Sequence, residues 1–268
     1  MFVTHASHYL KNEDGFVCVE EEDRHILAIA DGHGGKRASE ICITSLPNLI
    51  SACSNRTLPT HEEFETIFSR VHDLCQGLVS GSTLTVCVVD KHSDQFVCAN
   101  VGDSHCYLVT PTSHMCVSTS HRLQENAEER KRLGYSVKID NLGPPRLYPG
   151  GLACSRGIGD YDCPLLCWKP STSYETLTSQ TTLVLASDGI WDCLGTRRVL
   201  NTVRVTRHAK TVLRLRSQYT DDATIIVISK ERPSPRFGIT WFFKSGNGSA
   251  SSSSEDEDDM IRYPVSLQ

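Results

Sequence analysis

The stretch ILAIADGHGG, residues 26–35, joins a short apolar run to an aspartate and a group of glycines. Five consecutive apolar residues, two of them β-branched, are typical of a strand that is buried on both faces of a sheet. The chain is expected to turn at Asp31, because Gly32, Gly34 and Gly35 let the backbone bend tightly beside its carboxylate. This order predicts a rigid strand that presents an acidic side chain at its end.

The same combination of an apolar run and an acidic residue recurs along the chain. Its other members are Asp90 after residues 83–89, Asp103 after 96–101, Asp188 after 182–186, and Asp221 and Asp222 before 223–228. Runs of this length and composition predict strands, some of them buried on both faces.

Helical patterns lie between the predicted strands. The clearest covers His61–Leu78, where apolar residues recur on one face of a helix. Further helices are expected near residues 36–52, which Pro47 should bend or split, in 124–133, and once or twice in 196–217. Because strands and helices alternate irregularly, we expect an α+β domain with mostly antiparallel sheets and no simple doubly wound sheet.

The composition limits the possible functions. The chain has 268 residues, 39% of them hydrophobic, and a formal net charge of −5 that the acidic run 255–259 accounts for by itself. The charge gives no argument for nucleic-acid binding. We find no signal-peptide core and no run that could span a membrane, so we expect a cytoplasmic or nuclear protein whose 12 cysteines are free thiols. Cys163 and Cys167 lack a second pair for a zinc site.

The composition divides the chain near residue 230. Residues 1–230 are expected to form one catalytic domain, and residues 231–268, with a Ser-rich stretch and an acidic run, to form a disordered tail. Its apolar segment 239–243 is predicted either to dock on a surface or to add a short strand to the core. The serines beside the acidic run suggest that the tail is phosphorylated or binds a partner.

Acidic residues at several strand ends suggest a cation site. Carboxylates tolerate one another at close range only when protons or cations neutralise them. Oxygen ligands without a His or Cys cluster suit Mg²⁺ or Mn²⁺. Asp-Gly is also a common turn dipeptide, so spacing alone leaves the metal site and ordinary turns equally possible.

Seven short segments favour the metal site over ordinary turns. They are KNED (11–14), DGHGG (31–35), SGST (80–83), ANVGDS (99–104), GGLACSRGIGD (150–160), LASDGIWD (185–192) and DDATIIV (221–227). In this order the series resembles the protein phosphatase 2C family of metal-dependent protein phosphatases, over roughly residues 5–230. The resemblance implies a four-layer α-β-β-α sandwich of two mainly antiparallel sheets flanked by helices.

The resemblance also implies a site for two Mg²⁺ or Mn²⁺ ions and a third, weaker ion. Asp31 would bridge the first two ions. Asp188 and Asp221 would complete the first site, the Gly32 carbonyl and Glu13 the second, and Asp103 with Asp188 would hold the third ion. The implied metal ligands are therefore Glu13, Asp31, Gly32, Asp103, Asp188 and Asp221, while Asp14 would orient water.

The implied reaction is hydrolysis of phosphoserine or phosphothreonine by direct attack of a metal-bound hydroxide. In this scheme Asp31 is catalytic through the metal, and His33 would protonate the leaving alkoxide. Phosphorylated Ser/Thr proteins would be the partners of a monomeric enzyme that binds neither nucleic acid nor membrane. The basic segment 196–217 could attract them, although a solvated helix face explains it more simply.

One departure from the family pattern concerns the substrate phosphate. The family usually places an Arg four residues before the Glu of the acidic pair, and this chain has Tyr9 there. Tyrosine cannot grip phosphate with two parallel hydrogen bonds, so Lys11, Arg146 or Arg156 would have to contribute. The alternative interpretation is a pseudophosphatase that binds partners with weak or no turnover. Smaller departures are GDSH at 102–105 and SH at 120–121.

Overall fold

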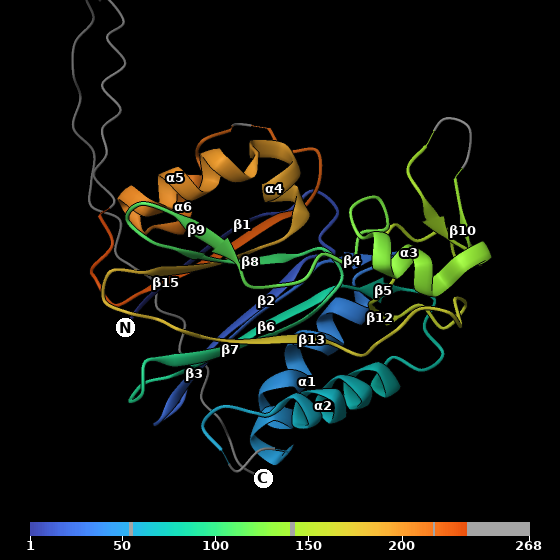
Figure 1. Cartoon of the computed structure of the whole chain (residues 1–268), viewed down its shortest axis with the longest axis horizontal. Helices are drawn as coiled ribbons and strands as arrows, with labels where there is room; N and C mark the ends of the chain where they lie inside the picture. Colours follow the sequence, from blue (N-terminus) through green and yellow to red (C-terminus); the bar gives the residue numbers. More distant parts are fainter. Residues whose placement is uncertain (54–55, 140–142, 217, 235–268) are drawn as a thin grey trace, which may run out of the picture. The chain divides into compact units, whose positions relative to one another are not determined.

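Two five-stranded antiparallel sheets form the centre of the molecule (Figure 1). The computed structural model describes residues 1–53, 56–139, 143–216 and 218–234. The first sheet has the order β1 (Phe2–His8), β15 (Ala223–Ser229), β14 (Thr182–Ala186), β8 (His105–Val109) and β9 (His114–Cys116). The second has the order β13 (Ser171–Thr176), β7 (Gln95–Val101), β6 (Leu84–Asp90), β3 (Arg24–Ala30) and β2 (Gly15–Glu20).

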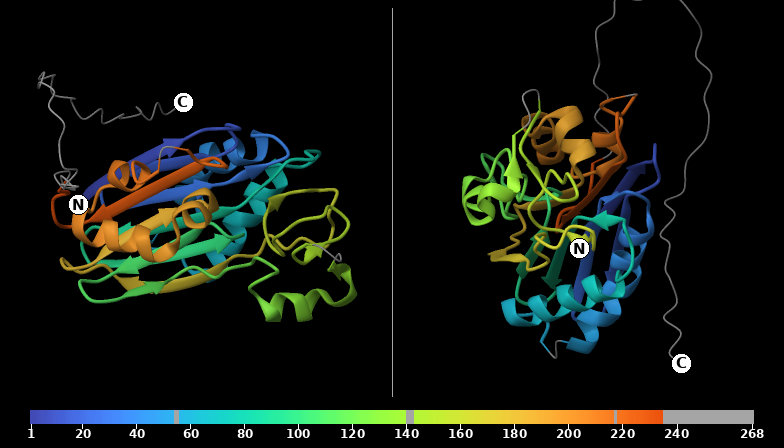
Figure 2. Two further views of the ribbon diagram at one scale, coloured as in Figure 1. Left: turned by 90° about the horizontal axis from the view of Figure 1, so that it is seen from above. Right: turned by 90° about the vertical axis from the view of Figure 1, so that its right-hand side faces the viewer.

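Helices cover the outer face of each sheet, which gives four α-β-β-α layers (Figures 1 and 2). The second sheet is covered by α1 (Arg37–Cys53) and α2 (His61–Leu74), and the first by α4 (Asp188–Leu194), α5 (Thr196–Thr206) and α6 (Ala209–Leu213). The predicted sandwich is confirmed. Of the two predicted effects of Pro47, the split is wrong, because α1 continues through this residue as one helix.

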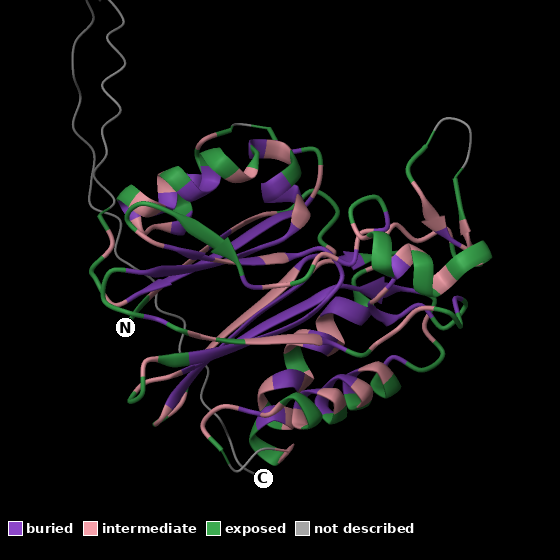
Figure 3. Ribbon diagram, in the orientation of Figure 1, coloured by how far each residue is buried: buried purple, intermediate pink, exposed green. Residues whose placement is uncertain are grey.

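Strand β3 shows why the opening stretch determines this architecture. All seven of its residues are buried. Ile26 and Ala28 pack into the core under α1 and α2, whereas Leu27 and Ile29 point into the layer between the two sheets. Side chains that alternate between two apolar environments require apolar residues at every position of the run 26–30. Figure 3 shows the same continuous burial along the central strands.

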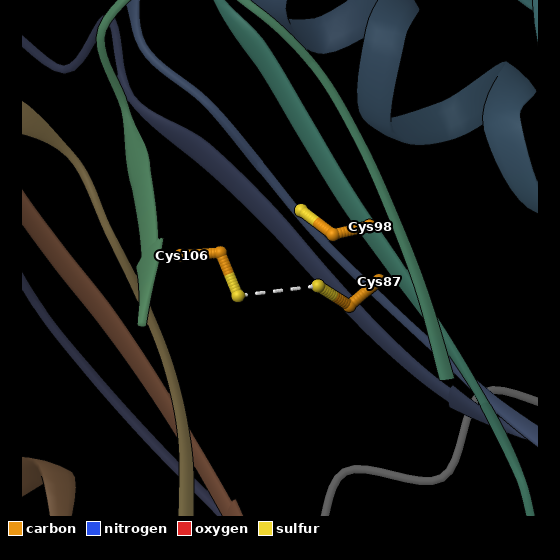
Figure 4. Close-up of side chains that lie close together, drawn as sticks. All are labelled: Cys87, Cys98 and Cys106. Carbon is orange, nitrogen blue, oxygen red and sulfur yellow. Dashed lines mark hydrogen bonds between the residues drawn. The ribbon is translucent and has the colours of Figure 1, made fainter. Parts of the chain in front are cut away.

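Three cysteines meet between the two sheets (Figure 4). Cys87 lies on β6 and Cys98 on β7, whereas Cys106 lies on β8 of the facing sheet. Their sulfurs all lie within 4.8 Å of one another, and the Sγ atoms of Cys87 and Cys106 are 3.4 Å apart. All 12 cysteines of the chain are free in the structure. The trio fills the apolar layer between the sheets as small apolar side chains do.

A flap and a small sheet lie beside one end of the sandwich. The flap contains α3 (Ala127–Leu133), a 3₁₀ turn (Gly134–Ser136), β10 (Val137–Lys138) and β11 (Arg146–Leu147). The small sheet has the order β12 (Ile158–Gly159), β5 (Gly81–Ser82) and β4 (Gly32–His33). Helix α3 begins three residues later than the sequence pattern suggests, because the Asn126 side chain accepts a hydrogen bond from the Glu129 N–H and caps it.

The C-terminal boundary is described only in part. Residues up to 234 still contact the domain, since the Glu231 carboxylate lies 2.7 Å from Arg207 and the Ser234 N–H donates to the Thr206 carbonyl. The predicted docking segment 239–243 and the acidic run lie outside the described residues. Within the described ranges, no helix is both long and apolar enough to cross a bilayer.

Candidate metal centre

The acidic residues at strand ends come together at one end of the sandwich. Asp31 follows β3, Asp103 follows β7 and Asp188 follows β14, while Asp14 directly precedes β2. The charges of Asp14, Asp188 and Asp103 all act on Asp31, so these four carboxyls share one region. Strands from both sheets therefore deliver carboxylates to the region around Asp31.

The pKa values show that these carboxyls repel one another. Burial, together with the charges of its three acidic neighbours, raises the pKa of Asp31 well above its usual range. Burial also raises the pKa of Asp14 and of Asp188 to about 6. One oxygen of Asp14 accepts a hydrogen bond from Ser187 at 2.9 Å, and the other receives none of regular geometry from the described residues. Such a group of carboxyls fits divalent cations, which would neutralise all of them together.

Glu13 and Gly32 lie against each other beside Asp31. A Cβ at position 32 would stand 2.5 Å from the Glu13 carbonyl oxygen, so only glycine fits there. The Glu13 carboxylate accepts a hydrogen bond from the Gly35 N–H at 2.7 Å, which fixes the side chain against the turn after β3. The structure therefore holds Glu13 against the turn that directly follows Asp31.

Asp221 lies at the edge of the site and is paired with Lys11. The Lys11 ammonium is 2.9 Å from one Asp221 oxygen and 3.0 Å from the other, and the lysine side chain is 52% exposed. Lys11 therefore points toward the acidic residues rather than away from them. This pair is exposed and single, so an incoming cation could displace the ammonium at little cost.

Asp222 was not predicted as a site residue, yet it shapes the loop that carries Glu13. Its carboxylate accepts hydrogen bonds from the backbone N–H groups of five consecutive residues, 10–14, at 2.5 to 3.2 Å. Burial alone would raise the pKa of Asp222, but these donors outweigh it and lower the pKa to about 2. The sequence signal was the Asp-Asp pair itself, in which only Asp221 matched the family's ligand.

Arg122 and Asp192 were also missed by sequence reasoning. The Arg122 guanidinium contacts three carboxylates: Nε lies 2.7 Å from Asp103, Nη2 lies 2.7 Å from Asp188, and Nη1 lies 2.9 Å from Asp192. Asp188 and Asp192 are four residues apart on α4 and so face the same side. A cavity of about 140 Å³ opens beside these four side chains. Arg122 therefore contacts one oxygen of Asp103 and one of Asp188, the two residues expected to hold the third ion.

His33 is positioned by Asp160, the last residue of the segment 150–160. The His33 Nε2 atom lies 2.9 Å from both oxygens of the buried Asp160 carboxylate. Burial alone would lower the pKa of His33, but the hydrogen bond and the charge of Asp160 outweigh it and raise the pKa. The imidazole remains about half exposed and stands one residue from the Gly32 carbonyl.

The side chains expected to hold phosphate are occupied elsewhere. Arg156 donates to Glu129 at 2.6 Å, and Arg146 donates to the Gly151 carbonyl at 3.2 Å. Tyr9 is 47% exposed. Lys11 faces the acidic cluster, as described above. Their roles toward a substrate stay predictions.

The carboxylates are spread more widely than the ligands of a single ion. Among the described residues, the only three His, Cys, Asp or Glu side chains whose ligand atoms all lie within 4.8 Å are the three inter-sheet cysteines. The acidic residues surround Asp31 instead of converging on one point.

Comparison with known proteins gives one consistent result. Residues 2–226 match the family model "Protein phosphatase 2C". A rice protein described as probable protein phosphatase 2C 3 is 31% identical over 236 residues, which cover 78% of this chain and 48% of that protein. The yeast protein phosphatase 2C homolog 2 is 28% identical over 231 residues, covering 76% and 48%. This chain thus spans about half the length of the curated relatives it matches.

Solved structures agree on the fold. The structure of a serine-threonine phosphatase 2C from Toxoplasma gondii superposes with a TM-score of 0.67 at 19% identity, covering 84% of this chain and 93% of the other. A sex-determining protein of C. elegans superposes with a TM-score of 0.68 at 18% identity, covering 84% and 64%. At these identities the likeness concerns the arrangement of sheets and helices alone.

Proposed function

Because the chain belongs to the protein phosphatase 2C family, we propose that it is a metal-dependent protein serine/threonine phosphatase. One observation supports this most directly. Asp31 lies among Asp14, Asp103 and Asp188, and burial together with their charges raises its pKa. Carboxylates gathered in this way without enough positive charge among their neighbours form a site for hard divalent cations.

We propose Glu13, Asp31, the Gly32 carbonyl, Asp188 and Asp221 as the residues that hold Mg²⁺ or Mn²⁺. Bound ions would offset charge on the phosphoryl oxygens and lower the pKa of a water molecule. The Asp14 oxygen without a regular hydrogen bond is suited to accept a hydrogen bond from a water molecule and so orient it. Asp222 keeps Glu13 in place by holding the backbone of residues 10–14.

His33 is proposed to protonate the leaving serine or threonine oxygen. Asp160 accepts from its Nε2 atom, so the charged imidazole is stabilised and its orientation is fixed. The ring is exposed enough to reach a substrate at the surface of the site. Asp160 acts here as a positioning residue, which adds a role that the sequence did not assign.

A second function is favoured by Tyr9. No guanidinium stands at that position, and in this structure Arg146 and Arg156 bond to other groups. A protein with this arrangement could bind a phosphorylated partner weakly and release it unchanged. The proposed metal ligands argue for turnover, so we place the binding protein second.

The deciding experiment is hydrolysis of a phosphothreonine peptide. We expect Mn²⁺-dependent phosphate release that EDTA abolishes and that Asp31→Asn lowers by about a hundredfold or more, since that variant removes the shared ligand. Asp90→Asn is the matched control, because Asp90 also ends a strand but only accepts hydrogen bonds from its own turn. A purified wild type that binds the peptide but releases no phosphate with Mn²⁺ would support the pseudophosphatase instead.

A further inference from the structure

Arg122 makes an unusual set of contacts for a single side chain. Each of its three guanidinium nitrogens meets a different carboxylate: Nε meets Asp103, Nη2 meets Asp188 and Nη1 meets Asp192. The acids come from two separate elements, the turn after β7 and the helix α4. A planar group with a permanent charge can serve all three at once, which an ammonium group cannot do with the same geometry.

The backbone around Arg122 is held on both sides. The His121 N–H donates to the Gly102 carbonyl at 3.0 Å, and the Leu123 N–H donates to the Ala153 carbonyl at 2.9 Å. The buried His121 ring adds a hydrogen bond from the Gly102 N–H to its Nδ1 atom at 3.1 Å. These contacts tie residue 122 to the same turn that carries Asp103. The guanidinium is therefore delivered to the carboxylates by a fixed segment.

The burial of Arg122 separates it from the other cation of the site. The Arg122 side chain is 21% exposed, and its partner Asp103 is 9% exposed, whereas Lys11 is 52% exposed and has a single partner. Charge pairs that are partly shielded from water are less screened by salt and harder to displace. Lys11 can give way to an ion in solution, but Arg122 is positioned to stay.

We propose that Arg122 is a built-in third cation, which replaces the third, weaker ion expected between Asp103 and Asp188, so that this chain binds two divalent ions. The proposal deepens the proposed function and rests on it for the two ions that remain. A divalent ion in the cavity beside Asp188 and Asp192 would face the guanidinium at close range and be repelled. The positive charge at this corner then does not depend on the metal concentration, because it belongs to the chain.

Counting bound Mn²⁺ tests this without measuring activity. Equilibrium dialysis with metal analysis, up to millimolar Mn²⁺, is expected to give two ions per wild-type chain. Arg122→Met keeps the length of the side chain but removes the charge. We expect this variant to bind a third Mn²⁺ ion, with an affinity at least about tenfold higher than that of the wild type for any third ion. Arg132→Met is the matched control, because Arg132 contacts Glu129 and the Ser155 carbonyl outside the acidic cluster; it should bind two ions.

Thermal unfolding provides a second measurement on the same proteins. The melting temperature of the wild type should stop rising once two ions are bound, whereas that of Arg122→Met should keep rising into millimolar Mn²⁺ as the extra site fills. Arg122→Lys keeps one positive charge near the acids and should still bind two ions. Arg122→Gln removes the charge but keeps a hydrogen-bonding end group, so it should also bind the third ion, and it covers the case in which Arg122→Met does not fold.

The outcomes separate this inference from the proposed function. A wild type that hydrolyses the phosphopeptide and binds three ions overturns only the role of Arg122. The same ion count in the wild type, Arg122→Met and Arg122→Lys overturns it as well. A wild type that binds no Mn²⁺ and releases no phosphate overturns the proposed function and this inference together.

Discussion

The flap and the metal centre both bring arginines to carboxylates, but with opposite balances of charge. In the flap, one buried acid, Glu129, accepts from both Arg132 and Arg156, and also from the Ser155 hydroxyl. In the metal centre, Arg122 and Lys11 face a larger number of acids. Positive groups are in excess in the flap, and negative groups are in excess around Asp31.

The pKa values express this difference. Burial alone would raise the pKa of Glu129, but the hydrogen bonds from Arg156, Arg132 and Ser155 outweigh it and lower the pKa to about 2. Burial and neighbouring acids raise the pKa of Asp31. Carboxylate–arginine contacts therefore do not identify a functional site by themselves. The site is the place where the chain leaves negative charge uncompensated, to be completed by something it binds.

The largest expected effect comes from removing the buried acid of the flap, Glu129. Glu129→Gln leaves two guanidiniums without their carboxylate and should lower the free energy of unfolding at pH 7 by about 2 kcal/mol. Because the folded pKa of Glu129 lies below its unfolded value of about 4.5, this contribution is complete above that pH and is lost as the pH falls toward 2. Urea unfolding at several pH values should show the two proteins converging in acid.

The control for this change is Glu128→Gln, since Glu128 is exposed on the same helix. It should change stability by less than about 0.5 kcal/mol. Equal losses of unfolding free energy in the two variants would mean that any acidic residue on α3 stabilises the protein to the same degree. The contrast between the flap and the acidic site would then be contradicted.

A smaller effect of opposite sign is expected at the unbalanced region. Asp31→Asn removes one of the mutually repelling charges and should raise the free energy of unfolding of the metal-free protein by about 1 kcal/mol. The same change should abolish the stabilisation that the wild type gains from Mn²⁺. Differential scanning calorimetry with EDTA and with Mn²⁺ measures both. If Asp31→Asn were less stable than the wild type in EDTA, the claim that the acidic residues around Asp31 repel one another would be contradicted.

The smallest effect is expected for the exposed pair. Lys11→Met removes a single, solvent-exposed contact with Asp221 and should change stability by less than about 1 kcal/mol. Lys36→Met, which breaks the exposed pair of Lys36 with Glu40, serves as the comparison. Denaturant unfolding at low and at high salt measures the loss of unfolding free energy in both variants. A clearly larger loss for Lys11→Met than for Lys36→Met, unchanged at high salt, would show that Lys11 has a stronger role than expected.

Much of the fold follows from local sequence. The run 26–30 predicts β3 because all of its residues enter apolar layers, and the runs at 96–101, 182–186 and 223–228 predict β7, β14 and β15 within one residue. Helix α4 could not be predicted in the same way. Its sequence begins with Asp-Gly, which favours a turn, and the helix is stabilised by packing Ile190 and Trp191 into the core under the first sheet.

The residues of the site likewise fall into those that local sequence indicates and those that it does not. Asp31 and Asp188 stand beside their strands in the sequence, so a local pattern indicates them. The roles of Arg122 and Asp222 depend on partners that the fold brings from far away: Arg122 meets Asp188 across 66 positions, and Asp222 meets Leu10 across 212. Contacts of this kind arise only once both sheets are assembled, and they leave no mark in a short stretch of sequence.

The rate at which the three cysteines between the sheets are alkylated can report how often the sandwich opens. Cys87, Cys98 and Cys106 are at most 1% exposed, so an alkylating reagent reaches them only when the two sheets separate. Cys116 is exposed and reacts without any opening. The alkylation rates of the three buried cysteines relative to that of Cys116, measured by mass spectrometry, would report how often the two sheets separate in the native protein. The same rates measured with a ligand bound at one end of the sandwich would show whether binding there suppresses the separation along the whole length of the two sheets.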